Sequence, residues 1–261
     1  MIRGWTVVLA LSAGMAWGQG APDVSLIPPR KPVTEVEGAT EVSRTPPETP
    51  APHETEAVVT QTPQPLAPPV WQTLQETDAA FVSCLGALNA LGAVYALTDA
   101  QTGADRDCGI ALPVRLSQPV AGVDMADPAL MRCETAVALG TWLRDFVQPA
   151  AATLDRGPVV TLSKGSGYQC RRRNNQSDGQ LSEHAYGNAI DITGFGFKDG
   201  SQIKVTPRER EGSREESFQD AVRATACLYF STVLGPGSDD AHNDHLHLDV
   251  IARDGGFRLC Q

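Results

Sequence analysis

The sequence lacks several features that would point directly to a function. Lys and Arg number 21 against 31 Asp and Glu, giving a net charge of −10, whereas nucleic-acid-binding domains carry a basic face. None of the six cysteines belongs to a C-x-x-C pair, which argues against a zinc site built from cysteine. Histidine is scarce, with five in 261 residues. We therefore expect no nucleic-acid partner and no cysteine-ligated metal.

Long apolar runs and phosphate-binding loops are also missing. Residues 235–239 read GPGSD, without the lysine or the spacing of a phosphate-binding loop, so they predict a turn. The N-terminal apolar run, from Trp5 to Leu11, is shorter than the roughly 20 residues that a membrane span needs. With Arg3 before it and small residues after it, this run predicts a signal peptide at residues 1–20, with an uncleaved anchor as the alternative. After cleavage we expect no membrane span, and a periplasmic or secreted protein.

The composition changes twice along the rest of the chain. Residues 21–70 hold 12 of the 19 prolines, with too few apolar residues to offset the chain entropy lost on folding. They predict a disordered, proline-rich linker. Residues 71–261 have the composition of a globular protein and are numerous enough for one domain with a core.

All six cysteines lie in this globular part, at positions 84, 108, 133, 170, 227 and 260. An even number of widely spaced cysteines in an exported chain predicts up to three disulfides. Six cysteines allow about fifteen pairings, and the sequence does not choose among them.

Apolar periodicity predicts three helices. One falls within residues 71–92, and another within residues 214–230. Between them, Asp127 is expected to cap a helix that has Pro128 in its first turn and ends near Pro149.

Four segments predict strands or extended chain. Residues 108–116 contain Pro113, which suggests an edge strand or a loop. Residues 158–170 read as a β-branched strand that runs into a glycine-rich turn. Residues 188–195 and 245–250 alternate in a way that is typical of strands.

Two short windows hold four of the five histidines. They are "SEHAYGNAID" at 182–191 and "HNDHLH" at 242–247. Because side chains alternate along a strand, His245, His247 and Asp249 should project from one face. In the other window Gly187 allows the tight bend that brings His184 and Asp191 together.

Such a convergence suits zinc. Catalytic zinc sites use three ligands from His, Asp, Glu or Cys and keep one position for water. We expect His184, Asp191 and His247 to be the ligands of a Zn²⁺ ion. His245 would then lie near the open position, where it could act as a general base.

These windows resemble known motifs. "SEHAYGNAID" and "HNDHLH" are similar to the S-x-H-x-x-G-x-A-x-D and H-x-H motifs of the LAS metallopeptidases, which include lysostaphin, D-Ala-D-Ala peptidases and the hedgehog signalling domain. The H-x-x-H-x-H spacing resembles penicillin-insensitive murein endopeptidases more than carboxypeptidases, which place a glutamate before the last histidine. With "YQCRRRN", "LGPGSDDAHNDHLHLD" and the six cysteines, residues 70–261 resemble the bacterial extensin-like C-terminal domain family.

The resemblance implies roles for further residues. His184, Asp191 and His247 would be the zinc ligands, His245 the catalytic base, and His242 a residue that supports the site or contacts substrate. A substrate-binding arginine follows a Ser-Gly-Tyr turn in related peptidases, which suggests Arg171 here, with Arg172 and Arg173 as alternatives.

The sequence thus predicts an α+β domain in which a small antiparallel sheet carries the zinc site, flanked by helices and stapled by disulfides, as in the LAS and hedgehog domains. The expected function is a zinc-dependent peptidase that acts on peptidoglycan peptides, either cross-links or stems. Two alternatives stay open. One is a non-catalytic, zinc-stabilised module that binds cell wall or protein, and the other is a disulfide-held structural domain without metal.

Overall fold

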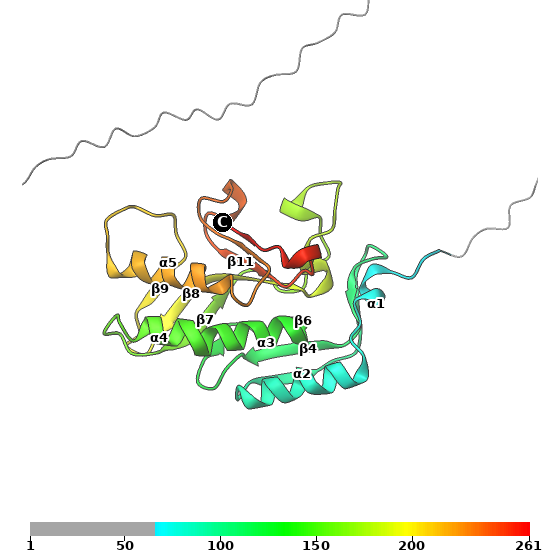
Figure 1. Ribbon diagram of the computed structural model, residues 1–261, viewed down its shortest axis with the longest axis horizontal. Helices are drawn as coiled ribbons and strands as arrows, with labels where there is room; N and C mark the ends of the chain where they lie inside the picture. Colours follow the sequence, from blue (N-terminus) through cyan, green and yellow to red (C-terminus); the bar gives the residue numbers. More distant parts are fainter. Residues whose placement is uncertain (1–65) are drawn as a thin grey trace, which may run out of the picture. The chain divides into compact units, whose positions relative to one another are not determined.

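The computed structural model describes residues 66–261. The signal peptide and nearly all of the proline-rich linker expected from the sequence lie outside the described residues. Within residues 66–261, helices and strands are mixed in an α+β arrangement, and the strands form sheets of seven, three and two (Figure 1). The expected α+β class is therefore confirmed.

The helices are α1 (Val70–Thr73), α2 (Asp78–Ala90), α3 (Cys133–Trp142), α4 (Gln148–Ala151) and α5 (Arg214–Ala226). A π-helical turn, η1 (Leu143–Val147), joins α3 to α4, and short 3₁₀ helices include η3 (Glu183–Tyr186) and η4 (Asp240–His242). The strands are β1 (Val94–Leu97), β2 (Gln101–Thr102), β3 (Gly109–Ile110), β4 (Pro113–Gln118), β5 (Asp124–Met125), β6 (Ala129–Arg132), β7 (Val159–Lys164), β8 (Ala189–Phe197), β9 (Gln202–Lys204), β10 (Thr232–Leu234), β11 (Leu246–Asp249) and β12 (Leu259–Cys260).

The seven-stranded sheet has the order β12-β10-β11-β8-β7-β5, with β9 paired to β8. The central strands β10, β11, β8 and β7 pair antiparallel. The two outer pairs, β10 with β12 and β5 with β7, are parallel. The antiparallel pairing expected around the site is thus present, within a sheet that is mixed at its edges.

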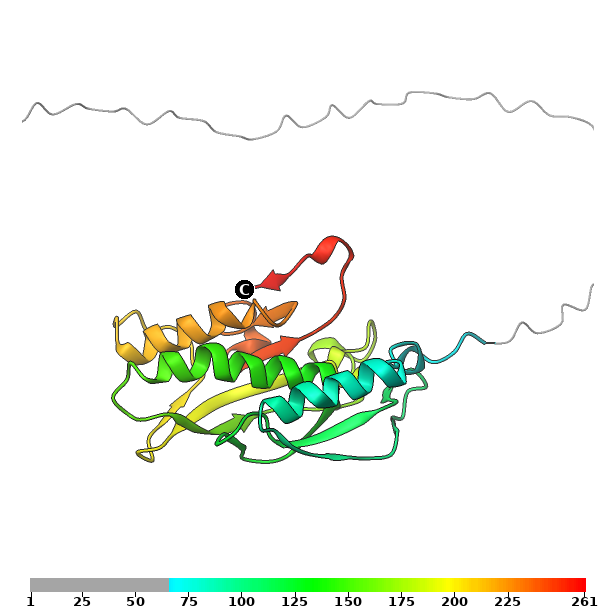
Figure 2. The ribbon, with the colours of Figure 1, turned by 60° about the horizontal axis from the view of Figure 1, so that its bottom comes forward.

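One face of this sheet is covered by helices. Figures 1 and 2 show α3 and α5 lying side by side over it. Ile190 and Ile192 of β8 and Leu248 of β11 are buried in the core beneath these helices. At the centre of the helical layer, the Trp142 indole donates to the Val222 carbonyl over 3.1 Å. Strand alternation therefore sends every second residue of β8 and β11 to the opposite face.

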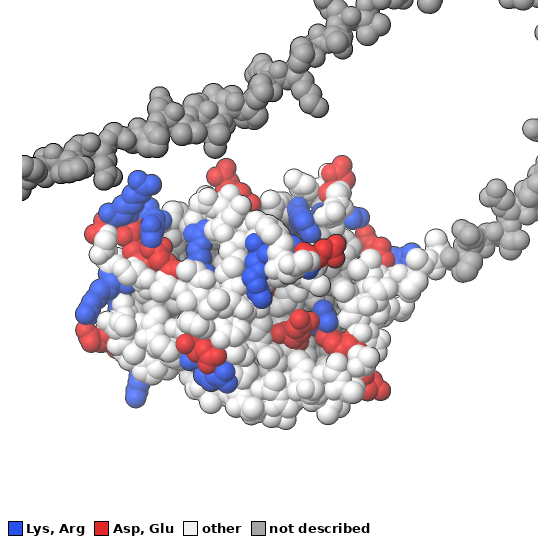
Figure 3. Space-filling model, in the orientation of Figure 1, with Lys and Arg blue, Asp and Glu red and all other residues white. Residues whose placement is uncertain are grey.

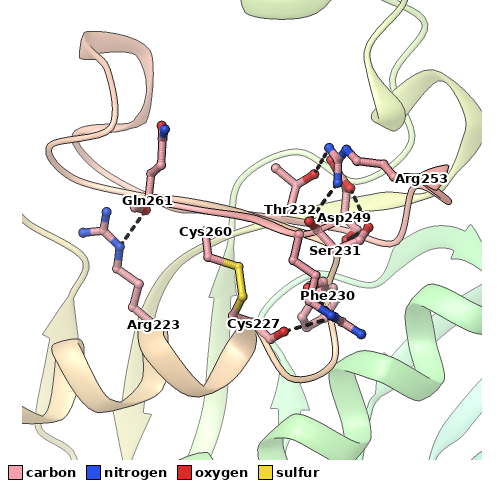
Figure 4. The surroundings of a disulfide bond; sticks show 10 residues. Arg223, Cys227, Phe230, Ser231, Thr232, Asp249, Arg253, Cys260 and Gln261 are labelled. Atoms are coloured by element: carbon pink, nitrogen blue, oxygen red, sulfur yellow. Dashed lines mark hydrogen bonds between the residues drawn. A yellow bond between two sulfur atoms is a disulfide. The ribbon is translucent and has the colours of Figure 1, made fainter. Parts of the chain in front are cut away.

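Three disulfides join distant parts of the domain, as the even cysteine count predicts. They pair Cys84 with Cys133, Cys108 with Cys170 and Cys227 with Cys260. The first connects α2 to the start of α3, and the third connects the end of α5 to β12 (Figure 4). Disulfides of this number are typical of proteins in an oxidising compartment, such as the periplasm or the extracellular space.

The expected start of the second helix is wrong. Residues Ala129–Arg132 form β6, which pairs with β4, so α3 begins only at Cys133 with Arg132 as its N-cap. Asp127 caps no helix, and its carboxylate forms an ion pair with Lys164 Nζ at 2.8 Å instead. Here strand pairing outweighs the local capping signal.

Two expectations based on proline also need correction. Pro149 does not end the helix, because it lies in the first turn of α4, where a backbone N–H is not required. Pro113 does not mark an edge, because β4 is the middle strand of the three-stranded sheet β1-β4-β6. It is the first residue of that strand, a position that tolerates proline. The predicted helix at 214–230 and the strands at 188–195 and 245–250 match α5, β8 and β11 closely.

Among residues 66–261, no helix combines the length and the apolar character that crossing a membrane requires. Figure 3 shows acidic and basic side chains interspersed on the visible face, rather than one basic field.

Candidate metal centre

The two sequence windows meet on the open face of the large sheet. Asp191 in β8 lies directly opposite His247 in β11 in the antiparallel register. Their strand neighbours Ile190 and Leu248 face the helices, so Asp191 and His247 face away from the core. Asp191 Oδ1 lies 3.0 Å from His247 Nδ1, and both side chains are buried.

His184 reaches the same point from the loop before β8. It lies in η3, which ends at Gly187 with φ +69° and ψ 15°. This left-handed conformation suits glycine and reverses the chain into β8. The imidazole of His184 is fully buried, and its Nε2 lies 3.1 Å from Asp191 Oδ1 and 3.1 Å from His247 Nδ1. The bend expected at Gly187 is present.

These three atoms form a nearly equilateral triangle with edges of 3.0 to 3.1 Å. Ligands about 2.0–2.1 Å from a tetrahedral zinc ion lie about 3.3–3.4 Å apart, which is close to these edges. His184, Asp191 and His247 therefore form a buried cluster that could hold a metal ion.

Outer partners orient both imidazoles. The Gly167 carbonyl accepts a hydrogen bond from His184 Nδ1 at 2.8 Å, and Asp249 Oδ2 accepts one from His247 Nε2 at 3.3 Å. When the rings are neutral, His184 Nε2 and His247 Nδ1 point lone pairs at each other and at Asp191 Oδ1. Three acceptors without a donor among them can be satisfied by a metal ion or by a proton on one of the rings.

The pKa shifts in this cluster also favour a positive charge beside Asp191. Burial raises the pKa of Asp191, but hydrogen bonds and charges from His184 and His247 outweigh it and hold the pKa well below the usual range. Burial lowers the pKa of His247, but Asp191 and Asp249 outweigh it and raise the pKa to about 9. Two buried carboxylates therefore favour a positive charge between them.

His242 and His245 lie beside the cluster, outside the triangle formed by His184, Asp191 and His247. His245 Nδ1 donates to Asp244 Oδ1 at 2.8 Å, and its Nε2 lies 3.7 Å from Asp191 Oδ1. His242 Nδ1 donates to Asp239 Oδ1 at 2.6 Å. Burial lowers the pKa of His242, and this effect exceeds the opposing effect of Asp239. Both rings are thus oriented by a carboxylate on Nδ1, which leaves Nε2 free.

The cluster opens into a groove with a volume of about 410 Å³, within the usual range for ligand sites. Asp191, His247 and Asp249 line it together with His242 and His245.

Of the three consecutive arginines, Arg171 and Arg173 line the groove and Arg172 does not. Arg172 turns away and forms an ion pair with Asp105 at 2.9 Å. Arg173 lies 3.7 Å from Glu183. Arg171 donates to the Gln169 side chain at 3.0 Å, and no carboxylate among residues 66–261 forms an ion pair with it.

A second buried carboxylate supports the histidine loop. Burial raises the pKa of Glu183, and this effect exceeds the lowering caused by a hydrogen bond from Asn188. The Asn188 amide donates to Glu183 at 2.9 Å, and its oxygen accepts from Arg132 at 2.8 Å. Arg132 also pairs with Glu76 at 2.8 Å. This network anchors the loop that carries His184 to α3 and to the segment before α2.

Comparison with protein families identifies the domain. Residues 82–261 match the family model described as the extensin-like protein C-terminus. The chain belongs to this family. No curated protein and no solved structure matches the chain.

The sequence did not indicate every residue of the site. Strand alternation placed Asp249 on the same face as His247 but did not show that it supports this imidazole. Asp239 and Asp244, which orient His242 and His245, stand beside the histidines in sequence without any distinguishing pattern. Arg253 also lines the groove, and no motif or periodicity marks it.

Proposed function

We propose that the protein is an exported, zinc-dependent peptidase of the LAS type that acts on peptidoglycan peptides, either cross-links or stems. One observation carries the proposal. His184, Asp191 and His247 converge in one cluster, and Asp191 and His247 line an open groove. Three protein ligands with an accessible side are typical of catalytic zinc, whereas structural zinc is enclosed by four.

The donor set supports zinc over harder cations. Two imidazole nitrogens and one carboxylate oxygen suit zinc, while Mg²⁺ and Ca²⁺ prefer all-oxygen sites. Bound here, zinc would supply a Lewis acid that polarises a peptide carbonyl and acidifies water.

His245 is proposed as the general base. Asp244 Oδ1 accepts a hydrogen bond from the Nδ1–H of this ring at 2.8 Å, so Nε2 is the nitrogen that can accept a proton in the groove. Nε2 lies 3.7 Å from Asp191 Oδ1, which places it next to the ligand cluster without joining it. This position fits the transfer of a proton to and from the reacting groups.

Two other groove residues are proposed to contact the substrate. Arg171 has no carboxylate partner among the described residues, so its guanidinium can donate to a peptide carbonyl or carboxylate. His242, oriented by Asp239, has a free Nε2 and can hydrogen-bond the substrate or stabilise developing negative charge.

Cell-wall peptides are proposed as substrate because the two histidine motifs resemble those of murein peptidases. The disulfides fit a domain that works outside the reducing cytoplasm, where these peptides occur. A proline-rich segment before the domain would give it reach toward the cell wall.

The test compares the oxidised, zinc-loaded protein with its His245→Ala variant. Zinc content and the digestion of purified sacculi and stem peptides are measured on both. We expect about one zinc per chain in both proteins and a loss of hydrolysis of about 10²–10⁴-fold in the variant. Absence of hydrolysis by the zinc-loaded parent protein would contradict the proposal and favour the non-catalytic binding module.

A further inference from the structure

The C-terminal segment after β11 forms one side of the groove. Arg253 and Leu259 of this segment line the same cavity as His247 and Arg171. The segment returns to the sheet at β12, which pairs with β10 and is tied to the end of α5 by the Cys227–Cys260 disulfide (Figure 4). Arg253 is therefore held by the fold at the groove, rather than on a free chain end.

Arg253 is fixed by neutral acceptors only. It donates to the Ser231 carbonyl at 2.8 Å and to Thr232 Oγ1 at 2.6 Å. No carboxylate among residues 66–261 forms an ion pair with it, whereas Arg132 and Arg172 each have one. Its guanidinium is thus not committed to a carboxylate, and some of its five N–H donors remain available.

Asp249, an acidic side chain on the neighbouring strand, is already engaged. Asp249 lies opposite Thr232 in the β10–β11 register. Its Oδ2 accepts from His247 Nε2, and its Oδ1 accepts from the Ile251 amide at 3.1 Å. Asp249 therefore orients a proposed metal ligand and forms no ion pair with Arg253.

Arg253 and Arg171 reach the groove from different elements. Arg253 bonds to Thr232 of β10, and β10 is the strand next to the one that carries His247. Adjacent strands lie about 4.8 Å apart, which places Arg253 about one strand away from the His247 row. Arg171 lies in the connection between β7 and β8. The groove is also lined by Glu183, Asp191 and Asp249, but these carboxylates are held by Asn188 or by the histidine cluster. Two arginines in one groove, without a carboxylate partner among the described residues, favour an anionic ligand.

We propose that Arg253 binds a carboxylate of the substrate, so that the groove selects peptides with a free carboxylate on the β10 side of the metal cluster. The inference rests on the proposed function for the kind of substrate, and it names the residue that selects the acidic group. Planar guanidinium groups bind carboxylates through paired hydrogen bonds. Peptidoglycan stems carry several free carboxylates within a few residues, and any of these could be the carboxylate that Arg253 binds.

The test measures binding rather than turnover. The full oxidised chain, zinc-loaded and carrying His245→Ala to prevent hydrolysis, is titrated calorimetrically with the tetrapeptide L-Ala-γ-D-Glu-meso-diaminopimelate-D-Ala. Three further peptides replace the glutamate, diaminopimelate or C-terminal carboxylate by an amide. We expect one amide to bind about tenfold more weakly, which identifies the carboxylate that Arg253 holds. Adding Arg253→Gln should remove this discrimination, and Arg253→Lys should restore part of it.

Arg258→Gln is the matched control. Arg258 belongs to the same segment and also braces carbonyl groups, those of Cys227 and Phe230, but it does not line the groove. This variant should keep the discrimination, which separates ligand binding from bracing of the segment. Equal affinity for all four peptides, persistence of the discrimination in Arg253→Gln, or no binding of the tetrapeptide would each overturn the inference. Because no step of this test requires hydrolysis, failure of the inference about Arg253 can be distinguished from failure of the proposed peptidase activity.

Discussion

Asp191 and His247 face each other directly across β8 and β11, although 56 residues separate them in the sequence. In an antiparallel pair, directly opposite side chains point to the same face of the sheet. The strand register alone therefore brings this carboxylate and this imidazole to 3.0 Å. His184 is the member of the cluster that comes from a loop, and Gly187 sets its approach.

This register leads to a prediction about zinc binding. Asp191→Asn or His247→Ala should abolish it, because each alters one of the three proposed ligands that form the corners of the triangle. The disulfides and the helix-covered core lie elsewhere, so the fold should persist. Zinc content after dialysis and the circular dichroism spectrum check both points. His242→Ala, outside the triangle, is the control that should keep its zinc, while unchanged affinity in both ligand variants would refute the assignment.

Asp249 should affect the metal without touching it. Asp249→Asn keeps the shape of the side chain but weakens the hydrogen bond that orients His247 at 3.3 Å. Loss of such a support typically costs about 10–100-fold in metal affinity. Competition with a chromogenic chelator measures the change. Asp244→Asn, which alters only the partner of His245, should shift the affinity far less. Equal effects of the two variants would show that Asp249 has no special role.

Local pattern predicted much of the site. Alternation in "HLHLDV" separates His247 and Asp249 from the core residues Leu246 and Leu248, and the structure has this arrangement. The positive φ of Gly187 was likewise foreseeable, because a tight turn before a strand favours glycine. In both cases the information lies within a few residues.

The features that the sequence did not reveal depend on distant contacts. Asp127 resembles a helix cap, yet pairing of β6 with β4 delays the helix to Cys133. The disulfide partners lie 33 to 62 residues apart in the chain, beyond the range of any periodicity. Arg253 is held at the groove by hydrogen bonds to Ser231 and Thr232, which lie 22 and 21 residues earlier in the chain, and no residue near Arg253 indicates these contacts.

Metal removal should leave a folded protein. The cluster lies on one face of the sheet, whereas the core, including Trp142, packs on the other. A chelator should therefore lower the thermal midpoint, since a bound ligand stabilises the native state, without unfolding the chain at room temperature. Near-UV circular dichroism of the oxidised protein before and after chelation measures this. Unfolding on chelation, as in small zinc fingers, would assign the metal a structural role.

Gly187 and Gly122 form a matched pair for testing the loop that carries His184. Both have positive φ, +69° and +78°, so alanine at either position adopts a left-handed conformation that costs about 1–2 kcal/mol. At Gly122 a Cβ would meet nothing within 4 Å, whereas at Gly187 it would collide with Ile110 Cδ1. Overpacking of this kind costs about 1–3 kcal/mol more.

Gly187→Ala should thus lower the free energy of unfolding more than Gly122→Ala, as measured by guanidinium denaturation of the oxidised chain. It should also weaken zinc binding, because a shifted turn moves His184 away from Asp191, while Gly122→Ala should leave zinc affinity unchanged. Equal losses of stability in the two variants would mean that Ile110 moves aside freely and that the turn is not constrained by packing.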